Sequence, residues 1–244
     1  MDNSLMVALQ NQRILQERLD VTANNLANAA TTGFKADGLL FEQLVKRPAQ
    51  SEALPHDVRF VADAGLMRDM SQGPIMRTGS PLDVAIEGDG FFIVQGPNGM
   101  AYTRDGSFTV SQDGTLVTKD GRPVLSQTGS PVVFDSQGGN PTIDADGSVR
   151  VEGVEAGQIG MAKFADPSAL RKIGDNLYTA AGQTAQSADD SRMVQFALEN
   201  SNVRPVIELT RLIEISRAYE SAARIVKNGD DMRKETIDRM GRAA

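Results

Sequence analysis

A glycine pair, an acidic loop and a lone histidine are the groups whose types and spacing suggest chemistry. Gly88-Asp89-Gly90 resembles the start of a dinucleotide-binding loop, which holds phosphate on main-chain N–H groups at a helix N-terminus. The third glycine of that loop is missing, because position 93 is Ile93, and a strand-like run follows in place of a helix. The residues therefore predict a tight turn and no phosphate site.

Asp144-Ala145-Asp146-Gly147 resembles the middle of a calcium-binding loop. If Gly147 takes the place of the glycine that such a loop requires, Thr142 falls on the first ligand position and Gly153 on the last. Neither residue supplies the carboxylate that a calcium loop needs at its ends. The better prediction is an ordinary Asp-Gly hairpin turn.

His56 is the only histidine of the chain, and there is no cysteine. Multi-histidine and thiolate metal sites, disulfide bonds and cysteine nucleophiles are therefore excluded. Asp57 follows His56, but no Gly-x-Ser-x-Gly motif supplies the serine of a hydrolase triad. We expect a solvent-facing His56, no catalytic residue, no cofactor and no metal site, and hence a protein that is not an enzyme.

The net charge of −7 over 244 residues is unevenly distributed. Residues 51–203 carry eleven basic and twenty acidic side chains, a net charge of −9, whereas both ends are near neutral. A nucleic-acid partner is not expected, because phosphate binding needs a basic surface. We also expect no membrane insertion, because no stretch approaches the ~20 apolar residues of a membrane-spanning helix. The first residues lack the basic region and the long apolar run of a cleavable signal peptide.

The first thirty residues predict one amphipathic helix with a narrow seam. Positions along the seam alternate in spacings of three and four, and most of them are apolar or small: Leu5, Ala8, Gln12, Leu15, Leu19, Thr22, Leu26 and Ala29. So narrow a stripe suits packing against other helices better than nucleating a globular core. Gly33 is the expected C-terminal stop.

The C-terminal region predicts a second helix of the same kind. Its apolar series starts at Val206, and Pro205 fits the first turn of such a helix, where its missing N–H costs nothing. Its seam runs over Leu209, Leu212, Ser216, Tyr219, Ala223 and Val226, and resumes at Ile237 and Met240. Glutamates and arginines alternate on the other faces, as on a solvated or partner-facing surface. Asn228-Gly229-Asp230-Asp231 predicts a kink or an interruption.

Between these helices, from Ile86 to about Phe164, short strand-like runs are separated by turn dipeptides. The expected turns are of type I′, in which both central residues have positive φ. They are Asn98-Gly99, Asp105-Gly106, Asp113-Gly114, Asp120-Gly121 and Asp146-Gly147. The expected strands are Phe91–Val94, Ala101–Arg104, Phe108–Val110, Leu116–Thr118 and Pro123–Leu125. The spacing predicts a meander of very short strands.

Together these elements predict an α+β fold with long amphipathic helices, packed together, at the two ends and a β-rich middle. We expect a terminal helical assembly domain (1–33 and 204–244), an extended linker region (34–80 and 180–203) and a β-rich body domain (81–179). In an alternative arrangement the terminal helices fold back over the strands and complete the core of a monomer. The narrow seams and wide charged faces favour assembly with other helices.

Three blocks of the chain resemble one protein family. Ala23-Asn24-Asn25-Leu26-Ala27-Asn28, with Thr31 and Gly33-Phe34-Lys35, resembles the N-terminal signature of bacterial flagellar rod and hook proteins. Pro81–Phe92 and Tyr102–Phe108 resemble the body domain that this family shares, and Ser201-Asn202-Val203, with Tyr219-Glu220, resembles its C-terminal signature. The blocks occur in the family's order and cover most of the chain.

The resemblance implies a structural subunit of the flagellar basal-body rod, exported by the flagellar type III apparatus without a cleavable signal peptide. Such a subunit assembles helically within the periplasm into the axle that transmits torque. The implied partners are other rod proteins, proximal and distal, copies of this chain and the export apparatus. The assembly interface is expected at Leu5, Leu15, Leu19, Asn24, Asn25, Leu26, Asn28, Phe34, Asn202, Val203, Leu209, Leu212, Tyr219 and Val226.

The choice among family members depends on length and on one short segment. The length suits a rod protein, and Asn202-Val203-Arg204-Pro205-Val206 resembles a proximal-rod member, in which proline often stands at this place. A distal-rod or hook-type protein is the alternative within the family. A soluble helical binding or adaptor module is the alternative from a different class.

Overall fold

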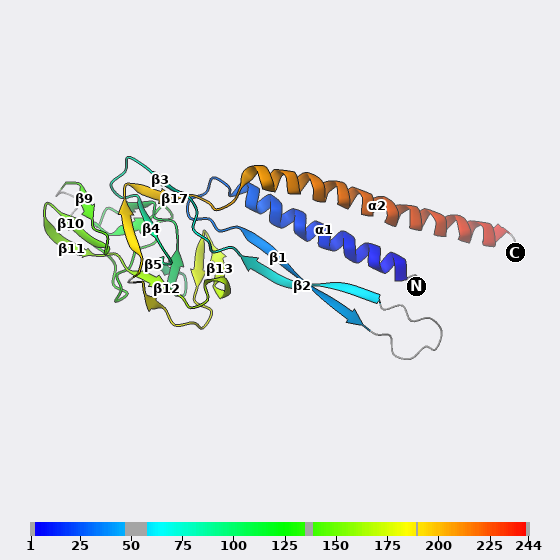
Figure 1. Ribbon diagram of the computed structural model, residues 1–244, viewed down its shortest axis with the longest axis horizontal. Helices are drawn as coiled ribbons and strands as arrows, with labels where there is room; N and C mark the ends of the chain where they lie inside the picture. Colours follow the sequence, from blue (N-terminus) through cyan, green and yellow to red (C-terminus); the bar gives the residue numbers. More distant parts are fainter. Residues whose placement is uncertain (1–2, 47–57, 135–138, 189, 243–244) are drawn as a thin grey trace. The chain divides into compact units, whose positions relative to one another are not determined.

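The computed structural model describes residues 3–46, 58–134, 139–188 and 190–242 (Figure 1). The chain divides into two compact units. Unit 1 comprises residues 1–27, 37–67 and 204–244, and unit 2 comprises residues 28–36 and 68–203. His56 lies outside the described residues.

Unit 1 contains two long helices and a two-stranded ribbon. Helix α1 (Asn3–Ala27) and helix α2 (Pro205–Arg242) lie side by side, and strand β1 (Asp37–Lys46) pairs with strand β2 (Val58–Arg68) (Figure 1). Pro205 takes the first helical position, as expected. The predicted interruption at Asn228-Gly229-Asp230-Asp231 is wrong, because α2 continues to Arg242. A single glycine inside a helix costs only about 1 kcal/mol, which 38 consecutive helical residues tolerate.

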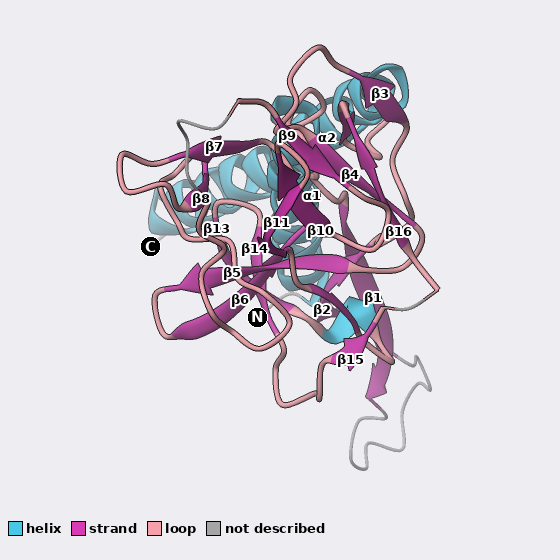
Figure 2. Cartoon of the chain, turned by 90° about the vertical axis from the view of Figure 1, so that its left-hand side faces the viewer, coloured by secondary structure: helices cyan, strands magenta, loops and turns pink. Residues whose placement is uncertain are grey.

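Unit 2 is built from short antiparallel strands, as Figure 2 shows. Its main sheet, within the described residues, has the order β13 (Arg171–Gly174), β14 (Leu177–Thr179), β6 (Gly99–Thr103), β5 (Phe91–Gly96), β12 (Met161–Lys163), β15 (Gln186–Ser187). A second sheet has the order β11 (Val154–Gln158), β10 (Ser148–Val151), β9 (Pro141–Ile143). The strands that pair outside these sheets are β16 (Arg192–Gln195) with β4 (Val84–Glu87), β17 (Ala197–Glu199) with β3 (Ile75–Arg77), and β7 (Phe108–Val110) with β8 (Leu116–Thr118). One 3₁₀ turn, Pro167–Ala169, is described. The α+β class is therefore confirmed.

Strand β5 lies at the centre of the core because both of its faces are covered. Phe92 and Val94 point into one buried cluster, whereas Phe91 and Ile93 point into another. This explains the uninterrupted apolar run in the sequence, since a strand buried on both faces loses the usual polar alternation. The strands predicted at Phe108–Val110 and Leu116–Thr118 are confirmed to the residue.

The predicted turn type is wrong, although most of the turns exist. Asp113-Gly114 joins β7 to β8 and Asp146-Gly147 joins β9 to β10, but only the glycine of each pair has positive φ, 78° and 87°. Two consecutive positive φ values occur instead at Glu152-Gly153, 52° and 84°, between β10 and β11, and at Asp175-Asn176, 47° and 55°, between β13 and β14. An aspartate can thus begin a hairpin turn without itself adopting the left-handed conformation.

Asp105-Gly106 forms no hairpin, because β6 and β7, which it connects, pair with other strands. Gly106 has no positive φ. A Cβ at this position would overlap the main-chain oxygen of Val84, the first residue of β4. Close packing, and not a left-handed turn, explains this glycine.

The sites considered from sequence have ordinary structural roles. Gly88-Asp89-Gly90 connects β4 to β5, and Asp146 accepts hydrogen bonds from Ser148 within the β9–β10 turn. In the part of the chain that the structure describes, no cluster of side chains is suited to hold a metal ion. None of the described helices combines the length and the apolar character that crossing a membrane requires.

Candidate functional site

The helix pair of unit 1 is joined by a small apolar seam. Leu15 of α1 packs with Ile215 and Ala222 of α2, and all three side chains are buried. Leu19 and Tyr219 pack against this cluster and are half-buried. Nε2 of Gln12 donates a hydrogen bond of 3.2 Å to the Tyr219 hydroxyl. The apolar contact between the two helices is therefore small, and most of each helix is not covered by the other.

The structure places the predicted seam residues unequally. Leu26, Leu212 and Val226 are half-buried, whereas Leu209 is exposed. The Leu5 side chain lies outside the described part of the chain. The buried positions of α2 recur every seven residues at Glu208, Ile215 and Ala222. Apolar spacing alone missed this register, because its first position is a glutamate.

Three exposed apolar residues form a second stripe on α2. Val206, Leu209 and Ile213 follow a three-four spacing and are 78%, 48% and 46% exposed. At 3.6 residues per turn, their mean direction lies about 150° around the helix from Ile215. The helix pair thus leaves an apolar edge uncovered on the side of α2 away from α1.

A polar cavity of about 390 Å³ lies between the helices and the start of β1. The buried Glu208 carboxylate accepts a hydrogen bond of 2.6 Å from Nη1 of Arg211 at its rim. Asn25, which is also buried, donates from Nδ2 to the main-chain oxygen of Asp37 (2.8 Å) and accepts from the Asp37 N–H at Oδ1 (2.9 Å). Asn25 therefore fixes the first residue of β1 onto α1, whereas its neighbour Asn24 is exposed.

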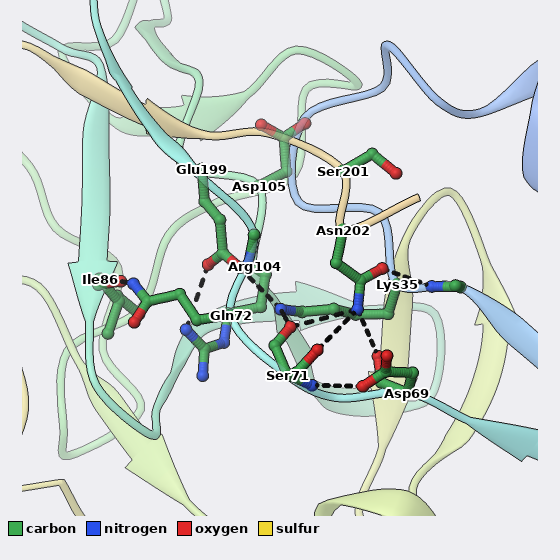
Figure 3. A network of polar contacts seen from close by, with 12 residues as sticks. Lys35, Asp69, Ser71, Gln72, Ile86, Arg104, Asp105, Glu199, Ser201 and Asn202 are labelled. Atoms are coloured by element: carbon green, nitrogen blue, oxygen red, sulfur yellow. Dashed lines mark hydrogen bonds and ion pairs between the residues drawn. The ribbon is translucent and has the colours of Figure 1, made fainter. Parts of the chain in front are cut away.

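A buried charged cluster, which we call the anchor, lies within unit 2 and consists of Lys35, Arg104 and Glu199 (Figure 3). Glu199 Oε1 accepts from Lys35 Nζ at 2.6 Å and from the Gly73 N–H at 2.8 Å. Its Oε2 accepts from Arg104 Nη1 at 3.1 Å. Lys35 Nζ also donates to the main-chain oxygen of Ser71 at 2.6 Å. The three charged side chains are between 1% and 3% exposed.

The electrostatics of the anchor are dominated by burial. Desolvation lowers the pKa of both Lys35 and Arg104 below their ordinary values, and attraction by Glu199 opposes this shift. With two cations and one carboxylate, the anchor has a formal charge of +1. Arg104 also lies over the Phe91 ring, 5.0 Å from its centroid, which stabilises a cation by the ring quadrupole. Removing the carboxylate would leave two buried charges without their ion-pair partner.

The two family-like signatures meet at this anchor. Asn202 Oδ1 accepts from the Ala36 N–H at 2.8 Å, and its Nδ2 donates to the main-chain oxygen of Asp69 at 2.8 Å (Figure 3). Phe34 is 1% exposed and Val203 is also buried. Asn28 is half-buried. These signature residues hold the segments that lead into and out of unit 2.

Gly33 has a role other than the predicted helix stop, since α1 already ends at Ala27. Its φ is 66°, its N–H donates to the main-chain oxygen of Glu199 at 2.8 Å, and a Cβ would overlap the main-chain nitrogen of Asp105. Both the conformation and the space at this position demand glycine.

The arrangement holds chain segments together. Both oxygens of Glu199 are occupied by cations and an N–H group, and no histidine or cysteine lies nearby in the described residues. Sequence reasoning did not single out Arg104 and Glu199 as site residues. The available signal was weak: a glutamate at the end of an apolar strand, and an arginine next to a turn.

Three family models match the chain. One, described as flagella basal body rod protein, matches residues 3–35; another, described as flagellar hook protein FlgE/F/G D1 domain, matches residues 85–151. The third, flagellar basal body rod FlgEFG protein C-terminal, matches residues 194–239. Together they include both helices and much of unit 2.

Individual relatives extend the similarity to the full length. The chain is 44% identical to a flagellar basal-body rod protein FlgF of Caulobacter vibrioides, and the match covers 99% of each chain. It is 36% identical to FlgF of Mesorhizobium japonicum, again over 99% of each chain. It is 32% identical to FlgG of Bacillus subtilis over 96% of this chain and 98% of that protein.

Proposed function

The chain belongs to the family of flagellar basal-body rod proteins, and we propose that it is a proximal-rod subunit that assembles helically through its terminal helices. It is a structural protein of the flagellar basal body and not an enzyme. Its 44% identity to FlgF of Caulobacter vibrioides, against 32% to FlgG of Bacillus subtilis and 34% to FlgG of Borreliella burgdorferi, supports the proximal over the distal position. Its partners are other rod proteins, and we extend them to copies of itself and to the type III export apparatus.

One observation supports assembly through the helices above all others. Helix α2 buries one stripe against α1 and exposes a second one at Val206, Leu209 and Ile213. An exposed apolar edge on a helix is stabilised when another helix covers it, at about 25 cal/mol per Å² of apolar area buried. We assign the exposed stripe to contacts between subunits.

The remaining predicted interface residues have a supporting part in this proposal. Leu15, Leu19 and Tyr219 hold α1 and α2 together, and the half-buried Leu212 and Val226 lie on α2 beside them. Asn25, Phe34, Asn202 and Val203 fix the ends of the segments that connect the two units. A contact that joins two different surfaces of identical copies builds an open helical tube when the rotation between copies does not close into a ring, and a rod requires this open case. Such a tube in the periplasm, reached by export without a cleavable signal, would transmit torque.

The proposal is tested by Leu209→Asp in cells that lack the native chain. We expect the variant to be made and to have the helicity of the native chain, since Leu209 is 48% exposed, but to be absent from isolated basal bodies. Ser221→Asp, at an exposed polar position of the same helix, is the matched control and should be incorporated. Incorporation of Leu209→Asp at the level of the control would show that the exposed stripe does not form the contact between subunits. Absence of the native chain from basal bodies, together with a stable complex with one soluble partner, would favour the adaptor alternative.

A further inference from the structure

Unit 2 exposes an apolar patch on the ribbon of β3 and β17. Met76 is 55% exposed and Phe196, which precedes β17, is 45% exposed; Ile75 is also exposed. Strand β3 pairs with β17 alone among the described strands, so its outer edge keeps free main-chain groups. Arg77, at the end of β3, is exposed and has no ion-pair partner in the described residues. The patch is therefore apolar with a cation at its side.

The backbone holds the Phe196 ring at the surface at a conformational cost. Its φ is 59°, a left-handed value that bulky residues rarely adopt. The Phe196 main-chain oxygen accepts a hydrogen bond of 2.7 Å from the Thr78 N–H, which fixes the residue to the end of the ladder. Strain of this kind persists where the surrounding structure imposes it and is concentrated at binding sites. An exposed aromatic ring in a strained position indicates a contact that the free chain lacks.

A second, different patch lies at the tip of the β10–β11 hairpin. Val154, directly after the Glu152-Gly153 turn, is 71% exposed, more than any other large apolar residue of the described part of unit 2. Glu152 and Glu155 flank it, are exposed, and form no ion pair with a described residue. This patch is apolar with anions at its sides.

We propose that the β10–β11 tip of one copy docks on the β3–β17 patch of the next copy. Val154 would cover Met76 and Phe196, and Arg77 would meet Glu152 or Glu155, so that the two patches match in apolar character and have opposite charge. Within unit 2 the tip lies at one end and β3 lies on a flank (Figure 1; Figure 2), so one copy offers both surfaces to two different neighbours. A contact between unlike surfaces propagates into a helical assembly when the rotation between copies does not close into a ring. The inference rests on the proposed rod function and names a contact between the bodies of its subunits.

Cysteine cross-linking tests this contact without background from native cysteines of the chain, because it has none. Full-length chain carrying Met76→Cys and Val154→Cys replaces the native protein in cells, and basal bodies are isolated and oxidised. We expect disulfide-linked dimers and higher multiples of the chain, and only monomer from either single substitution. The matched control pairs Val154→Cys with Ile173→Cys on β13, which is 42% exposed and lies outside the β3–β17 ribbon. It should give several-fold less product.

Charge reversal gives an independent readout at the same contact. In the Met76→Cys, Val154→Cys background, Arg77→Glu alone or Glu152→Arg with Glu155→Arg should lower the cross-linked yield by about two- to fivefold, the effect of an exposed ion pair. Combining the reversals should restore the yield. Restoration also shows that the variants fold, since a misfolded chain cannot be rescued by a second reversal.

The outcomes separate this inference from the function on which it rests. If the Met76→Cys, Val154→Cys chain enters basal bodies but gives no more cross-linked product than the control pair, the proposed contact is wrong. The rod assignment is unaffected by that result. A cross-linked product whose mass is not a multiple of the chain's overturns the choice of a second copy as partner. If the unsubstituted chain is absent from basal bodies, both the rod assignment and the proposed contact are wrong.

Discussion

Glu199→Gln changes one oxygen of a buried carboxylate to nitrogen and removes its charge. The glutamate is ion-paired with Lys35 at 2.6 Å and Arg104 at 3.1 Å, and all three side chains are at most 3% exposed. The substitution keeps the volume of the side chain, so no cavity forms. Both cations stay buried, however, and lose the charge that compensates them.

The structure allows the size of the effect to be estimated. Breaking a buried ion pair by removing one partner costs about 3–5 kcal/mol, because the other charge remains desolvated. Two cations are affected here, which places the expected loss of unfolding free energy at the upper end of this range. For a unit of this size, such a loss corresponds to a fall in Tm of about 10–15 °C.

Urea unfolding of the full chain measures this loss. The chain contains three tyrosines and no tryptophan, and Tyr102 and Tyr178 are buried in unit 2, so the near-ultraviolet circular dichroism of tyrosine reports mainly on that unit. The matched control is Glu87→Gln, because Glu87 is also ion-paired, with Arg192 at 2.8 Å, but both side chains are largely exposed. The control should lose less than about 1 kcal/mol. Equal losses for the two variants would refute the assignment of the anchor as a buried, compensated charge cluster.

Further predictions concern the anchor, the chain segment next to it and the helix pair. Lys35→Met should lower the unfolding free energy less than Glu199→Gln does, because it leaves Arg104 and Glu199 paired. The double variant should be more stable than Glu199→Gln alone, and a double-mutant cycle by urea unfolding measures this coupling. Burial lowers the pKa of Lys35, so between that lowered value and the ordinary 10.5 the unfolded chain binds a proton that the folded chain does not. In this pH window the unfolding free energy of the native chain should therefore rise with pH relative to that of Lys35→Met. Parallel pH profiles for the two proteins would contradict the burial of the amine. Gly33→Ala should cost at least about 3 kcal/mol in Tm-derived stability, because its Cβ meets main-chain atoms, whereas Gly182→Ala, at φ 88° but with open space around it, should cost about 1 kcal/mol. Leu15→Ala should lower the unfolding free energy of the helices by about 2–3 kcal/mol, as followed by circular dichroism at 222 nm. Leu9→Ala, on the exposed side of α1, should change this free energy by no more than about 0.5 kcal/mol. Similar losses for both variants would show that the α1–α2 seam contributes little to stability.

Features that depend on neighbouring residues were predictable from the sequence. The seam spacing located both helices, and the turn dipeptides located β7 and β8 because each short strand is bounded by its own turn residues. The seam of α2 was only partly predicted. Its register passes through Glu208, which an apolar pattern cannot include, and the pairing with Arg211 that permits its burial is a feature of the folded chain.

The anchor was not predictable from local pattern. Lys35 and Glu199 are 164 residues apart in the sequence, and Arg104 lies 95 residues from Glu199. Charged residues are normally exposed, so neither position suggests burial by its type. Only the fold, which brings the ends of unit 2 together, reveals that a lysine of the N-terminal signature and a glutamate just before the C-terminal one neutralise each other.

The position of Glu199 in the sequence also bears on when the protein can fold. Ribosomes make the chain from its N-terminus, so Lys35 and Arg104 emerge long before the carboxylate that compensates them. Until about four-fifths of the chain has been synthesised, closing unit 2 would bury the Lys35 ammonium and the Arg104 guanidinium without a counter-charge, which is strongly unfavourable. Contacts between residues so distant in sequence also form slowly. Unit 2 therefore cannot reach its full native stability until residue 199 has been synthesised, because only then is the charge of its buried cations compensated.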